Sequence, residues 1–173
     1  MTTAENTTAA PAPHLWLRIV LAVVALVELA DALSSVHNIF TDYHHATALL
    51  RFAQALTSVK LALAPLVAGA AAVLAVMGRT RHAIGALAAL ELLDWMLQDV
   101  WSIPFHGLEL SLNFGGIEAF FHHFVFPAVA IAGAALALKD PRLALAGLLV
   151  SLPTLINWTV VVVFTIGIII YGF

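Results

Sequence analysis

Five long apolar runs dominate this chain and restrict what it can fold into. They span about residues 15–36, 48–77, 82–101, 117–138 and 143–172. Each run reaches the roughly 20 residues that an α-helix needs to cross about 30 Å of hydrocarbon. Because 62% of the residues are hydrophobic and only 10% are charged, a water-soluble globule of this size could not cover its apolar residues with polar ones. The sequence therefore predicts an all-α, polytopic bundle of five transmembrane helices in a lipid bilayer.

Short polar segments separate the apolar runs, and another precedes them. Residues 1–13, MTTAENTTAAPAP, are polar, small and interrupted by proline, which predicts a disordered tail. Residues 14–173 are expected to form a single transmembrane domain. A cleaved signal over residues 1–32 is the competing interpretation, because Ala30-Asp31-Ala32 has the small-x-small pattern of a cleavage site. It lacks the basic segment that precedes the apolar core of a signal.

The distribution of cations predicts an orientation. If the spans alternate in direction, five cations fall on one side of the membrane: Arg18, Arg79, Arg81, Lys139 and Arg142. The opposite side carries Arg51, and Lys60 lies deeper within the second run. The positive-inside rule then predicts a bacterial-type inner (plasma) membrane protein whose N-terminus is cytoplasmic and whose C-terminus is outside.

Two pairs of acidic residues interrupt the apolar runs. Residues 27–33 read VELADAL and contain Glu28 and Asp31; residues 90–96 read LELLDWM and contain Glu91 and Asp94. In each pair the two acids are three residues apart and share one face of a helix. A carboxylate at the membrane centre costs about 2.5–3.5 kcal/mol on insertion scales. We therefore expect these acids to meet one another, a cation or water inside the bundle, and at least one to keep its proton near neutral pH.

The spacing of the acid pairs indicates an internal repeat. The second pair follows the first by 63 residues, and Arg18 and Arg81 each precede the glutamate of their copy by ten residues. A fainter third copy places Asn157 63 residues after Asp94. This pattern favours a duplicated two-helix unit followed by one further helix, as in membrane proteins built from parallel repeats. Chance matching between leucine- and alanine-rich helices is the alternative.

Counting 1.5 Å per residue from the cationic end places the acids near mid-membrane and a rim of nitrogen-bearing side chains beside them. The predicted binding site for a substrate or ion consists of the following residues: Glu28, Asp31, Lys60, Glu91, Asp94 and Asn157. His122 and His123 are expected to flank it. The competing interpretation is that the acids only hold helices together through interhelical hydrogen bonds.

The histidines leave a metal site open. Glu118 and His122 are four residues apart and can point at one atom, with His123 beside them. Together with ligands such as His44 and His45 they would suit a divalent metal. A bis-histidine haem is not favoured, because His122 and His123 lie on the same helix. Cysteine is absent, which excludes thiolate ligands and disulfides.

Three functions fit these observations. The first is a cavity, opening outward, that binds or moves a small cation or a proton-coupled solute. The second is a membrane-embedded enzyme or metal-binding protein that acts on a lipophilic substrate. The third is an accessory subunit of a larger membrane complex. The sequence does not decide between a homo-oligomer and a membrane partner protein, while a net charge of −3 without a basic patch gives no sign of nucleic-acid binding.

Overall fold

A computed structural model describes residues 15–40, 48–101, 103 and 113–172, which are helical and contain no strand. The α-helices are α1 (Leu15–Ser35), α2 (Ala48–Val76), α3 (Thr80–Asp94), α5 (Phe114–Phe120), α6 (Phe126–Ala137) and α7 (Leu143–Tyr171). Two π-helical segments, η2 (Trp95–Asp99) and η3 (Phe121–Val125), continue α3 and join α5 to α6. Two short 3₁₀ segments are η1 (Val36–Phe40) and η4 (Asp140–Arg142). The predicted helical runs are confirmed, and the predicted tail lies outside the described residues.

In the described residues, consecutive helical segments join into five helical rods, and four of these are long and apolar enough to cross a membrane: Leu15–Ile39, Ala48–Val76, Phe114–Ala137 and Leu143–Tyr171. The remaining rod, α3 continued by η2, carries Glu91, Asp94 and Asp99 along its length. It packs against α1, α2, α6 and α7, so its charged residues lie among other helices. This arrangement confirms an all-α membrane bundle, in which the most polar rod has the most neighbours.

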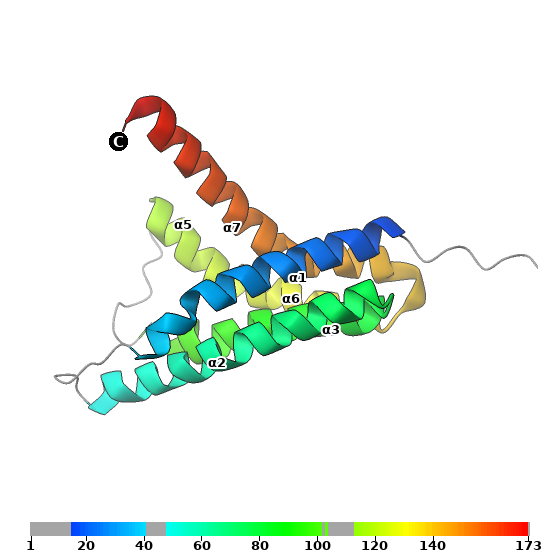
Figure 1. Cartoon of the computed structure of the whole chain (residues 1–173), viewed down its shortest axis with the longest axis horizontal. Helices are drawn as coiled ribbons and strands as arrows, with labels where there is room; N and C mark the ends of the chain where they lie inside the picture. Colours follow the sequence, from blue (N-terminus) through cyan, green and yellow to red (C-terminus); the bar gives the residue numbers. More distant parts are fainter. Residues whose placement is uncertain (1–14, 41–47, 102, 104–112, 173) are drawn as a thin grey trace, which may run out of the picture.

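The predicted cationic side corresponds to one end of the bundle. The start of α1, the joint between α2 and α3 and the connection from α6 to α7 lie together at that end (Figure 1). There Arg18 Nη2 donates a hydrogen bond of 2.6 Å to the carbonyl of Val76 at the end of α2. Its guanidinium also lies against Gly78, which turns the chain with a φ of 76°. A cation at a helix C-terminus is favoured by the helix dipole, so Arg18 ties α1 to the α2–α3 joint.

Small residues form the core of the cationic half of the bundle. Alanines with no exposed surface, such as Ala68 and Ala71 on α2, pack within the chain. Helices α6 and α7 approach so closely that a Cβ on Gly133 would lie 2.5 Å from Val150 Cγ1. A Cβ on Gly147 would likewise collide with Leu17 Cδ1 of α1. The small residues therefore hold α1, α6 and α7 together at this end.

The other half of the bundle is splayed. Helix α5 and the C-terminal half of α7 stand away from α1, α2 and α3 (Figure 1). Phe114 of α5 and Phe164 of α7 make an edge-to-face contact with ring centroids 5.3 Å apart. Pro153 is buried inside α7, and a proline there removes one backbone hydrogen bond and favours a bend. Tight packing at one end and divergence at the other leave room for a cavity between the two groups of helices.

Candidate functional site: a polar cavity between diverging helices

A cavity of about 660 Å³ lies in the splayed half of the bundle. Its wall is formed by α1, α2 and α3 on one side and by α5, η3, the start of α6 and α7 on the other. Its polar lining consists of Glu28, Asp31, Ser35, Lys60, Glu91, Asp94, Glu118, His122 and Asn157. All six residues predicted for the binding site thus face one space, although they come from four helices.

Helix α1 places its two acids on the cavity wall as the three-residue spacing predicted. Glu28 and Asp31 both line the cavity, and Ser35 follows one turn later. Glu28 Oε1 accepts a hydrogen bond of 2.6 Å from Thr154 Oγ1 of α7. Because Thr154 is buried, this bond connects α1 to α7 at the point where the two helices begin to diverge.

Helix α3 places Glu91 and Asp94 opposite α1, where Asp94 is paired with a cation. Lys60 Nζ of α2 forms an ion pair with Asp94 Oδ1 and donates a hydrogen bond of 2.8 Å to Gln98 Oε1. Lys60, one of the residues of the predicted site, is therefore the ion-pair partner of Asp94. It is the one lysine or arginine in the cavity lining, so the other carboxyl groups of the lining have no cationic side chain there to balance them.

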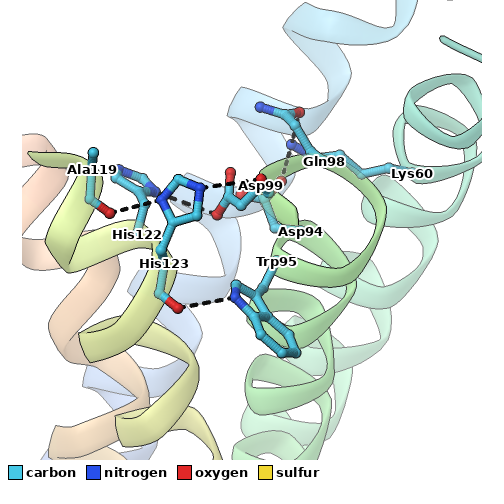
Figure 2. Close-up of polar contacts among 8 residues, drawn as sticks. All are labelled: Lys60, Asp94, Trp95, Gln98, Asp99, Ala119, His122 and His123. Atoms are coloured by element: carbon cyan, nitrogen blue, oxygen red, sulfur yellow. Dashed lines mark hydrogen bonds and ion pairs between the residues drawn. The ribbon is translucent and has the colours of Figure 1, made fainter. Parts of the chain in front are cut away.

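The two π-helical segments meet beside the cavity (Figure 2). Trp95 Nε1 in η2 donates a hydrogen bond of 3.1 Å to the backbone oxygen of His123 in η3. The His123 ring lies between two backbone oxygens, with Nδ1 2.8 Å from Ala119 and Nε2 3.2 Å from Asp99. A neutral imidazole carries one N–H and can donate to only one of them at a time. Segments of π-helix are frequent at functional sites, and here they fix α3 against α5 and α6.

Of the three predicted metal ligands, two line the cavity and one does not. Glu118 and His122 line the cavity, whereas His123 is held by backbone oxygens and is not part of the lining. His122 Nδ1 lies 3.9 Å from Asp99 Oδ2, and its ring packs edge-on against Phe126. In the part of the chain that the structure describes, no three histidine or acidic side chains are grouped as metal ligands. His44 and His45 lie outside those residues.

Two features of the site were not anticipated from the sequence. Thr154 was missed, although it lies 63 residues after Glu91, as Glu91 lies 63 residues after Glu28. The repeat spacing was therefore the signal that could have found it. The second feature is the direction of Trp95. Trp158 lines the cavity, whereas Trp95 donates a hydrogen bond to His123, and no sequence signal marks the π-helix that turns Trp95 in that direction.

Comparisons with protein-family models, with curated proteins and with solved structures found no match for this chain.

Proposed function

We propose that the cavity binds a small cation, or a solute whose movement is coupled to protons, and exchanges it across the inner membrane. The observation that carries this proposal is the convergence of five carboxyl-bearing residues and a single lysine on one cavity. Lys60 is already paired with Asp94. The other four acids of the lining therefore face the cavity without a lysine or arginine of their own, and a bound cation or bound protons would supply the missing charge.

The position of the cavity supports a direction of access. The cavity lies in the half of the bundle remote from the end that carries Arg18 and the α2–α3 joint. With the cationic end in the cytoplasm, as the positive-inside rule favours, the cavity faces outward. The tightly packed alanine and glycine core then separates it from the cytoplasm.

Three of the helices that line the cavity contribute at positions related by the 63-residue spacing. Glu28 of α1, Glu91 of α3 and Thr154 of α7 form one set, and Asp31, Asp94 and Asn157 form the other. Five of these six residues line the cavity, and the sixth, Thr154, bonds to Glu28. This arrangement favours the proposed internal repeat, in which each copy supplies one polar turn to a shared interior.

Proton release on cation binding tests the proposed function. The purified protein in weakly buffered detergent is titrated with sodium, tetramethylammonium or tetraphenylphosphonium chloride, and an indicator dye records protons released. We expect saturable release with at least one cation, because bound cation and bound proton compete for the same carboxyl groups. Glu28→Gln and Glu91→Gln should each weaken the binding at least about tenfold, equivalent to about 1.4 kcal/mol.

The matched control is Asp140→Asn, the same loss of a carboxyl group in the short connection between α6 and α7. It should release protons like the unmodified protein. Absence of release with all three cations, or equal release from both glutamine variants and the unmodified protein, overturns the proposal.

A further inference from the structure

The volume of the cavity indicates the size of ligand that it can bind. Its volume is about 660 Å³, within the range of roughly 300–1,000 Å³ typical of sites for organic ligands. A water molecule occupies about 30 Å³ in the liquid, so a single inorganic cation would share this space with many waters. In the described residues, no three histidine or acidic side chains are grouped tightly enough to ligate one metal ion. The carboxyl groups surround a volume and do not converge on a point.

The apolar part of the lining is as distinctive as the acidic part. Four aromatic side chains, from α5, η3, α6 and α7, line the cavity: Phe114, Phe121, Phe126 and Trp158. Aliphatic side chains from both walls, such as Leu61, Leu90 and Ile156, complete the apolar part of the lining. A site for a hydrated inorganic ion would gain nothing from such surfaces, whereas aromatic faces attract organic cations and desolvate them at low cost.

The acids and the aromatic residues occupy opposite walls. The paired acids are on α1 and α3, while the aromatic side chains come from α5 through α7. Among the lining residues that the structure describes, Glu118 is the one with a carboxyl group on the aromatic side. A ligand that bridges the two walls must carry positive charge on one face and apolar surface on another.

From this division we infer that the ligand is an organic cation with an aromatic or bulky apolar body. Its charge is held by Glu28 and Glu91, and its body packs against Phe121 and Trp158. The inference rests on the proposed function, because it names the class of cation that the same carboxyl groups bind. It goes further by assigning a specificity role to the aromatic wall, which discriminates against small inorganic cations.

A ranking of cations tests the inference. Equilibrium dialysis in detergent compares tetraphenylphosphonium, tetramethylammonium and sodium, with detergent lacking protein as the blank. We expect tetraphenylphosphonium to bind at least about tenfold more tightly than the other two cations. Neutral triphenylphosphine oxide serves as the uncharged comparison, and any binding of it should be the same in Glu91→Gln as in the unmodified protein. Trp158→Leu and Phe121→Leu should each weaken tetraphenylphosphonium binding by about five- to tenfold and weaken sodium binding by a smaller factor.

Two matched controls separate aromatic recognition from general loss of apolar surface. Trp16 is 44% exposed and Trp158 46%, but Trp16 is not part of the lining, so Trp16→Leu should leave binding unchanged. Phe124→Leu serves in the same way for Phe121→Leu. If sodium or tetramethylammonium binds as tightly as tetraphenylphosphonium and depends on Glu91, the organic-cation inference fails and the proposed function stands. If no cation binds in a manner dependent on Glu28 or Glu91, both fail.

Discussion

Gly133→Ile is expected to destabilise the folded bundle by more than about 3 kcal/mol, above the usual range for overpacking a core. A Cβ at this position would lie 2.5 Å from Val150 Cγ1 and 3.1 Å from the backbone oxygen of Ala146. Favourable carbon contacts lie at about 3.5–4.0 Å. Val150 is β-branched and cannot easily rotate away, and the Ala146 oxygen moves only if α7 moves. Reversible unfolding of the purified protein in mixed micelles, followed by circular dichroism, measures the loss.

Gly85→Ala is the matched control for this change. Gly85 also lies inside a helix, α3, but a Cβ there meets nothing within 4 Å. Removing a helical glycine at an open position should be neutral or stabilising by at most about 1 kcal/mol. Equal stability of Gly133→Ile and Gly85→Ala would show that α6 and α7 do not approach as closely as described, and the packed core beneath the cavity would then be wrong.

Lys60→Met is expected to cost about 2–3 kcal/mol of folding stability. Removing one partner of a fully buried ion pair costs about 3–5 kcal/mol, but the Lys60 and Asp94 side chains are 18% and 29% exposed to the cavity, which lowers the cost. Asp94 would lose its counter-ion beside the other carboxyl groups of the cavity, and Gln98 would lose a donor. The same unfolding assay in mixed micelles measures the change.

A double-mutant cycle isolates the ion pair from the other effects of Lys60→Met. Combined with Asp94→Asn, the loss should be less than the sum of the two single losses by about 1–2 kcal/mol, since the second substitution removes a charge that the first left unpaired. Lys139, at the cationic end of the bundle, provides the control: Lys139→Met and Asp94→Asn should add within about 0.5 kcal/mol. Additivity of Lys60→Met with Asp94→Asn would contradict the ion pair.

The helices and the position of the acids could be predicted because membrane physics leaves few options. Apolar runs of this length form helices in lipid, and a carboxylate at mid-membrane is driven inward. A cationic partner for the acids was expected from the same reasoning, since the charges must be balanced inside the bundle, and Lys60 supplies it to Asp94. These inferences required only the residue types and their depth along a helix.

The parts that the sequence did not reveal depend on local backbone geometry. A π-turn changes the direction of every side chain beyond it, and the two π-helical segments bring Trp95 and His123 into contact with each other outside the cavity lining. The divergence of α5 and α7 from α1 depends on how closely Gly133 and Gly147 let the helices approach at the opposite end. Such packing depends on which two helices meet and at which residues. The sequence pattern of one helix does not contain this information.

A pair of single-cysteine variants tests whether the acids face a water-filled interior. The chain has no cysteine, so Glu28→Cys and Leu26→Cys each introduce one thiol. The two positions are about 200° apart around α1 at 3.6 residues per turn. Glu28 lines the cavity, and Leu26 is 54% exposed on a face outside the lining.

The variants in lipid vesicles are treated with a water-soluble, cationic thiosulfonate, and intact mass spectrometry measures how much of each variant is modified. We predict that Glu28→Cys is modified and Leu26→Cys is not; modification of Leu26→Cys alone, or of neither, would contradict an acid-lined cavity inside the bundle.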